Sequence, residues 1–140
     1  MNKLKIKYKF LEHMADVKFQ AFGKNKEEAF LNSALALMEV VTEKVKIQDI
    51  SKRKIRVGGE DDVSLLYAFL EEFLYLLDAE DFVVGKIESL EIKDGTLSAM
   101  VLGDTASKYK FSNDVKAITY NEMFVREENE KWVAQVVLDV

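Results

Sequence analysis

Hydrophobic and polar residues alternate at the start of the chain and then change to a helical period. Alternation over Leu4–Phe10 and again over Asp16–Phe22 predicts two half-buried strands, because successive side chains of a strand point to opposite faces. Apolar residues then recur at helical spacing over residues 26–42, which predicts an amphipathic helix. A further strand pattern covers residues 47–57 and ends at two glycines.

A second helix is predicted over residues 62–78, with Asp61 or Asp62 as its N-cap. Its apolar residues occupy an unusually wide arc: Val63, Leu65, Leu66, Phe69, Leu70, Phe73, Leu74, Leu76 and Leu77. Helices that are apolar on most sides are buried, so we interpret this segment as a central core helix. The alternative is that Tyr67 and Tyr75 extend the apolar arc to a partner surface.

The second half of the chain has mostly strand patterns. Asp94-Gly95 between two such patterns predicts a tight hairpin, and a second hairpin is predicted near the C-terminal end. The predicted strands cover residues 82–92, 96–102, 115–126 and 131–140, with a loop or irregular strand over 103–114. The chain has no proline, linker or repeat, which indicates one domain over residues 1–140. The fold class is α+β, with two helices packed on a mainly antiparallel β-sheet.

Composition excludes several kinds of chemistry. The chain has no cysteine and a single histidine, His13, which excludes disulfides, thiolate catalysis and zinc sites built on several Cys or His ligands. The N-terminal segment lacks the apolar core of a signal peptide, and the longest apolar stretch is too short and too charged to span a bilayer. We therefore expect a soluble, cytoplasmic protein with no membrane partner.

The net charge of −5 does not favour direct nucleic-acid binding, which depends on lysine and arginine neutralising phosphates. The one dense basic run is Lys52–Arg56. We interpret it as a solvated strand edge, with an RNA-binding module as the alternative.

Candidate chemistry lies among the acidic residues. Glu12, His13 and Asp16 fall within five residues between two predicted strands. If the strand that starts at Asp16 pairs antiparallel with the last strand, Asp16 and Asp139 meet at one edge of the sheet, with Val140 beside them. Like charges this close are costly without a cation, and oxygen ligands suit calcium, magnesium or manganese. A metal-dependent hydrolase built on Asp16, Asp139 and His13 is the enzymatic alternative.

Several segments, in order along nearly the whole chain, resemble the archease family. They are Phe10–Val17 (FLEHMADV), Ala21–Lys24, Glu27–Phe30, Leu65–Leu76, Val115–Asn121 and the closing Trp132–Val140 (WVAQVVLDV). The sequence departs from the family pattern in three places. Met14 replaces a threonine, Asn121 replaces a histidine, and Asp104 stands where glutamate is typical.

The resemblance implies an accessory protein rather than an enzyme. Archeases activate the RtcB-type RNA ligase of tRNA splicing by promoting its guanylylation and repeated turnover, and they have been linked to a chaperone-like effect on a tRNA cytosine methyltransferase. Family members bind a divalent cation, and position for position the ligands here would be Asp16, Asp139 and Val140. Calcium is the first choice of ion, with magnesium and manganese as alternatives. Glu12 and His13 would be further contacts at the same tip. A general chaperone that modulates RNA-processing enzymes is the remaining alternative.

Overall fold

A computed structural model describes residues 6–12 and 15–140 of the chain. Along these residues, two strands are followed by a helix, a third strand and a second helix, and the rest of the chain is mostly strands. The elements are β1 (Tyr8–Leu11), β2 (Val17–Gly23), α1 (Lys26–Thr42), β3 (Ser51–Gly58), α2 (Asp62–Glu80), β4 (Phe82–Lys93), β5 (Thr96–Thr105), a 3₁₀ turn (Ala106–Lys108), β6 (Ala117–Glu128) and β7 (Lys131–Asp139).

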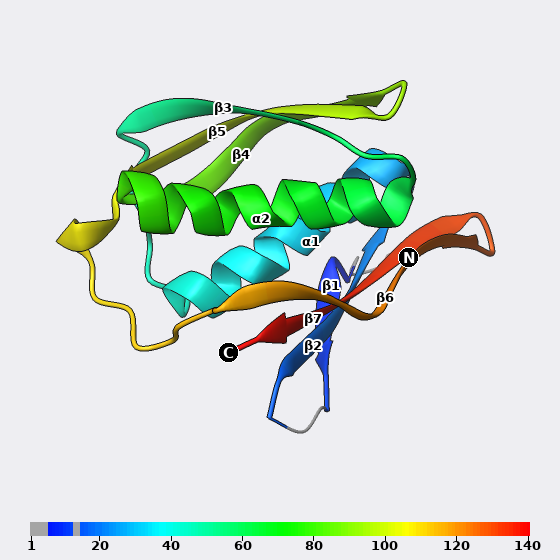
Figure 1. The fold of residues 1–140 in the computed structure, drawn as a ribbon, viewed down its shortest axis with the longest axis horizontal. Helices are drawn as coiled ribbons and strands as arrows, with labels where there is room; N and C mark the ends of the chain where they lie inside the picture. The colour runs from blue at the N-terminus through cyan, green and yellow to red at the C-terminus, as the bar shows by residue number, and fades with distance from the viewer. Residues whose placement is uncertain (1–5, 13–14) are drawn as a thin grey trace, which may run out of the picture.

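The described strands form two antiparallel sheets with the helices between them (Figure 1). One sheet has the order β1-β2-β7-β6 and the other β3-β5-β4. Both helices pack against strands of both sheets, so the core fills two interfaces. The predicted α+β class with antiparallel pairing is confirmed, and the single predicted sheet is divided into two.

This layered arrangement explains the wide apolar arc of α2. The helix lies against β6 on one side and against β3 and β4 on the other, so most of its circumference is covered (Figure 1). Leu66, Phe69 and Leu70 are each 0% exposed, which confirms the interpretation as a core helix. Asp61 is the N-cap, and its side chain accepts a 2.8 Å hydrogen bond from the Ser64 amide.

The predicted helix start and turns agree with the backbone. Asn25 caps α1 by accepting a 2.8 Å hydrogen bond from the amide of Glu28. Asp94 and Gly95 have φ angles of 52° and 74°, as a two-residue hairpin turn requires, and Asn129 and Glu130 have positive φ angles between β6 and β7.

The boundary predicted after residue 102 is wrong. β5 continues through Gly103 and Asp104 to Thr105, because this stretch still pairs with β4. Gly103 permits that pairing, since a side chain there would overlap the backbone carbonyl of Val83. The basic run Lys52–Arg56 lies on β3, at an edge of its sheet, with Lys52, Lys54 and Arg56 exposed, as predicted for a solvated edge.

Candidate metal-binding tip

β2 and β7 bring the two ends of the chain together. They pair antiparallel over the whole length of β2, from Val17 opposite Leu138 to Gly23 opposite Trp132. Asp16 precedes Val17 and Asp139 follows Leu138, so each aspartate lies one position beyond this pair, at the same end of the sheet. The antiparallel pairing that the site hypothesis assumed is therefore present. We refer to this end, with Asp16, Asp139 and Val140, as the acidic tip.

β6 supports the acidic tip from its other side. Ala117 pairs with Asp139, and the Lys116 amide donates a 2.7 Å hydrogen bond to the Asp139 carbonyl oxygen. This bond fixes the backbone of Asp139 while its side chain stays exposed. Val140 is 38% exposed. Figure 1 shows the C-terminus at the same end of the sheet as the start of β2.

The backbone before Asp16 is strained. Ala15 has a φ of 66°, in the left-handed region that residues with a Cβ rarely adopt. Asp16 itself is half-buried and lines an open cleft of about 480 Å³ together with Glu39, Glu43 and Asn113. The acidic tip thus continues into a hollow beside the C-terminal end of α1.

Glu43 helps to build that hollow, although the sequence analysis did not identify it. It ends α1 in the left-handed conformation, and its carboxylate accepts hydrogen bonds from the Ser112 amide (2.6 Å), the Ser112 hydroxyl (2.7 Å) and the Asn113 amide (2.7 Å). Bonds from the Ser112 hydroxyl and then from the Asn113 and Ser112 amides lower the pKa of Glu43. No sequence signal would have identified it, because the residues expected at this capping position are glycine and asparagine.

Asp81, at the end of α2, also accepts hydrogen bonds from the connection between β5 and β6. It also ends its helix in the left-handed conformation, and its carboxylate accepts bonds from the Ser107 amide (2.9 Å) and hydroxyl (2.7 Å). Two helix-terminal carboxylates therefore hold the connection between β5 and β6. This connection leads directly into the strand that supports Asp139.

β6 contains a bulge that the sequence analysis also did not identify. Its pairing with β7 is interrupted between Thr119 and Phe124, and Glu122 has a φ of 57°. Lys18 forms a 2.8 Å ion pair with Glu122, and the Gln135 side chain donates a 2.8 Å hydrogen bond to the Glu122 carbonyl. On the helix side, exposed Tyr120 stacks on half-buried Tyr67 with ring centroids 4.2 Å apart, so Tyr67 has an aromatic partner within the chain.

Of the two further residues predicted at the tip, Glu12 and His13, the structure describes only Glu12. Glu12 is exposed just after β1, whereas His13 lies outside the described residues, as does Met14. Within the described ranges, no group of three or more Asp, Glu, His or Cys side chains could hold a metal ion. The oxygen donors at the acidic tip are two carboxylates on adjacent strand ends and the main chain beside them. This donor set suits a hard divalent cation that keeps other ligands.

Comparison with known proteins agrees with the sequence signature and the fold. The model of the archease protein family matches residues 8–140. The chain belongs to the archease family. Protein archease of Pyrococcus furiosus is 42% identical over 135 residues, covering 92% of this chain and 95% of the relative. Protein archease of Methanosarcina barkeri is 35% identical over 139 residues, covering 95% of each.

Two solved structures have the same fold as this chain. The solution structure of protein 1598 of Methanobacterium thermoautotrophicum has a TM-score of 0.78 at 30% identity, covering 96% of this chain and 99% of the other. An archease from Thermotoga maritima, described as a possible chaperone, shares the fold with a TM-score of 0.66 at 16% identity, covering both chains fully. In this archease, neither helix of the described residues has the length and apolarity to cross a membrane.

Asp104, one of the positions that differ from the family pattern, is an internal acid. It is 3% exposed and accepts bonds from the Thr105 amide (2.7 Å), the Tyr109 hydroxyl (2.8 Å) and Lys108 Nζ (3.2 Å). Burial alone would raise the pKa of Asp104, but these bonds outweigh it and leave the pKa below its usual value. Asp104 therefore holds the turn after β5 rather than forming part of the acidic tip.

Proposed function

We propose that this archease is a non-enzymatic activator of an RtcB-type tRNA-splicing RNA ligase, acting in the cytoplasm. In this proposal it promotes guanylylation of the ligase and repeated turnover through the acidic tip. The observation that supports it best is the β2–β7 register, which brings Asp16 and Asp139 to one sheet edge from opposite ends of the chain. Membership of the family supplies the class of partner.

Asp16, Asp139 and the main-chain oxygens of Val140 are the proposed ligands of a divalent cation. Calcium is the preferred ion, with magnesium or manganese as alternatives, because the donors are all oxygen. Such an ion would neutralise the paired carboxylates and offer open coordination positions to phosphate oxygens. The hydrogen bond from the Lys116 amide to the Asp139 carbonyl holds one strand end in place. The bonds from the Ser112 and Asn113 amides to Glu43 hold the loop that leads to it.

The acidic tip is suited to approach a cationic nucleotide site on the ligase. Complementary charge increases the rate of docking and selects the orientation. The proposed role of Asp16 and Asp139 is to present the ion toward that site, where the partner carries out the chemistry. Glu12 would lie at the rim of the same contact, and His13 is proposed there from its place in the motif.

The test is guanylylation and RNA joining by an RtcB-type ligase from the same cells, with the ligase limiting, so that repeated turnover is measured. We expect wild-type archease to stimulate both, and Asp16→Asn and Asp139→Asn to abolish the stimulation. These changes keep side-chain size and remove charge, so the fold should be unaffected. Asp94→Asn is the matched control, because Asp94 lies in the β4–β5 turn, where asparagine also tolerates the positive φ.

Two results would overturn the proposal. Full stimulation of the ligase by both tip variants would show that the acidic tip is not needed for the activity. Stimulation of a tRNA cytosine methyltransferase, with none of the ligase, would assign the protein to a different RNA-processing enzyme. Circular dichroism of each variant separates loss of the fold from loss of the tip.

A further inference from the structure

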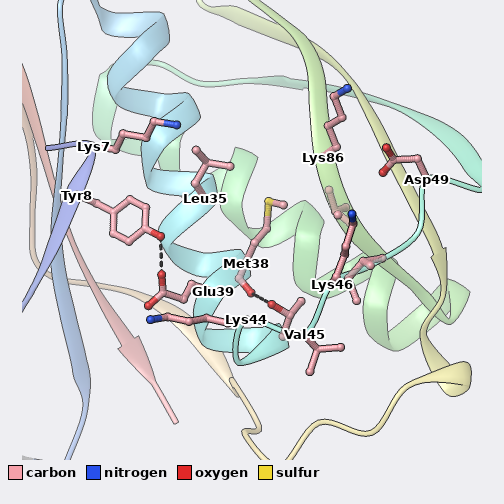
Figure 2. A pocket seen from close by; sticks show the side chains of 14 residues that line it. Lys7, Tyr8, Leu35, Met38, Glu39, Lys44, Val45, Lys46, Asp49 and Lys86 are labelled. Atoms are coloured by element: carbon pink, nitrogen blue, oxygen red, sulfur yellow. Dashed lines mark hydrogen bonds between the residues drawn. The ribbon is translucent and has the colours of Figure 1, made fainter. Parts of the chain in front are cut away.

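A separate cleft of about 440 Å³ opens between the outer strands of the two sheets, across α1. Its walls come from β1, which is the edge strand of one sheet, from β4, which is the edge strand of the other, and from the segment that follows α1. Figure 2 shows Lys7 and Tyr8 on the β1 side, Lys46 and Lys86 on the opposite side, and Met38 on α1 between them. The size is that of a small-molecule site.

The floor of this cleft is apolar and built by close packing. Leu35 and Met38 of α1 are half-buried there, beside buried Ile47 and Val84. β4 bulges at Gly85, where the pairing with β5 shifts. A Cβ at Gly85 would lie 2.7 Å from Cβ of Ile47, so only glycine lets β4 approach the segment after α1 this closely.

The rim of the cleft is cationic, although the chain as a whole has a net charge of −5. Among the described residues it carries four lysines, namely Lys7, Lys44, Lys46 and Lys86, none of which forms an ion pair with another described residue. Like charges around one hollow repel one another until an anion occupies it.

The carboxylates in the cleft leave much of this charge uncompensated. Two acids, Glu39 and Asp49, line it beside the four lysines. The Tyr8 hydroxyl donates a 2.5 Å hydrogen bond to Glu39, drawn in Figure 2. Burial and the bond to Glu39 raise the pKa of Tyr8 to about 12, so the hydroxyl remains a donor at neutral pH and Glu39 is directed toward β1. Asp49 lies on the same side as Lys46 and Lys86 (Figure 2).

We propose that this lysine-rimmed cleft binds a phosphorylated ligand of nucleotide size, with its phosphates at the rim and its base on the apolar floor. Lysine binds phosphate as a point charge, whereas planar carboxylates are best matched by the fork of arginine, which the cleft does not contain among its described lining residues. The nucleotide can be free or can be part of an RNA strand, since both present the same base and phosphate chemistry.

The test is a titration of the full chain followed by amide and methyl NMR shifts, in buffer with a chelator so that no metal at the acidic tip recruits the nucleotide. The probes are ATP, inorganic tripolyphosphate, a short single-stranded RNA and a glutamate-rich peptide. We expect ATP to shift the amides of residues 44–47 and 84–86 and the methyl group of Met38, and to bind more tightly than tripolyphosphate. RNA binding tighter than ATP at the same residues would identify a strand as the source, and the reverse would identify the free nucleotide.

The double variant Lys46→Gln/Lys86→Gln should weaken ATP binding roughly tenfold or more, since two charge-assisted contacts are lost. Lys93→Gln/Lys131→Gln is the matched control, because it removes the same charge from exposed lysines of two hairpins. An equal loss of ATP affinity in both double variants would mean that only the net charge of the protein matters, and this would overturn the proposal. Tighter binding of the peptide than of ATP, equal binding of tripolyphosphate and ATP, or shifts confined to other residues would overturn it as well.

Discussion

Replacing Gly103 by alanine tests how tightly the β4–β5 pairing is packed. A Cβ at Gly103 would overlap the carbonyl oxygen of Val83 and come within 2.9 Å of both the Val83 carbonyl carbon and Cζ of Phe82. Carbon atoms in contact normally lie about 3.5–4.0 Å apart, so the neighbours must move by at least about half an ångström. The main obstacle is backbone, which no side-chain rotation can relieve.

The expected cost is at the upper end for an overpacked core, about 3 kcal/mol. For a chain of 140 residues the entropy of unfolding is about 0.3 kcal/mol per kelvin, so this cost lowers the melting temperature by about 10 °C. Gly58→Ala is the matched control, because its Cβ would lie 3.6 Å from the nearest atom, the carbonyl oxygen of Gly95, in ordinary contact.

Both substitutions reduce the freedom of the unfolded chain equally, so the difference between them isolates the steric term. We expect Gly58→Ala to be neutral or stabilising by less than about 1 kcal/mol. The measurement is thermal and urea unfolding of both variants, followed by circular dichroism. Melting of Gly103→Ala within about 3 °C of Gly58→Ala would refute the packing argument.

Two further predictions concern titratable groups that hold the fold. Because the folded chain raises the pKa of Tyr8 from 10.0 to about 12, its contribution to stability is complete below the unfolded value and is lost as the pH rises from 10 toward 12. Above pH 10, the free energy of unfolding measured in urea should therefore fall less steeply for Tyr8→Phe than for the wild type. The same pH dependence in Tyr8→Phe and in the wild type would contradict this. Glu43 has a lowered pKa, so its contribution is present above the usual carboxyl value and is lost as the pH falls below it. Glu43→Ala should remove that acid dependence and speed amide exchange at Ser112 and Asn113, whereas Glu127→Ala, at an exposed acid, should change neither.

The sequence predicts most of the elements because their patterns are local. The Asn25 and Asp61 caps, the Asp94-Gly95 turn and the helical period of α2 each depend on a few neighbouring residues. The pairing of β2 with β7 was a condition of the site hypothesis rather than a prediction: Asp16 and Asp139 can meet only if their strands are neighbours, and the observed register meets that condition. Where a local rule exists, the prediction agrees with the structure within a few residues.

The features that could not be predicted depend on distant parts of the chain. Alternation in a strand says which face is buried but not which sheet the strand joins, so the division into two sheets was not visible. Glu43 and Asp81 occupy capping positions where glycine or asparagine is expected, and their partners lie on a connection far along the chain. The lysine-rimmed cleft draws its charges from residues 7, 44, 46 and 86, each of which looks like an ordinary exposed lysine in the sequence.

The cleft beside Asp16 and the lysine-rimmed cleft share a wall at the end of α1. Glu39 and Lys44, at the end of α1, line the cleft beside Asp16 as well as the lysine-rimmed cleft. Interactions between exposed charges are screened over about 8 Å at physiological salt, so any coupling between the two proposed sites would weaken as the salt concentration rises. A cation at the tip and an anion in the cleft would each make the other more favourable, and such coupling is necessarily reciprocal. If both proposed sites are occupied, Glu39 and Lys44 at the end of α1 lie between them and are the residues through which a change at one site would reach the other.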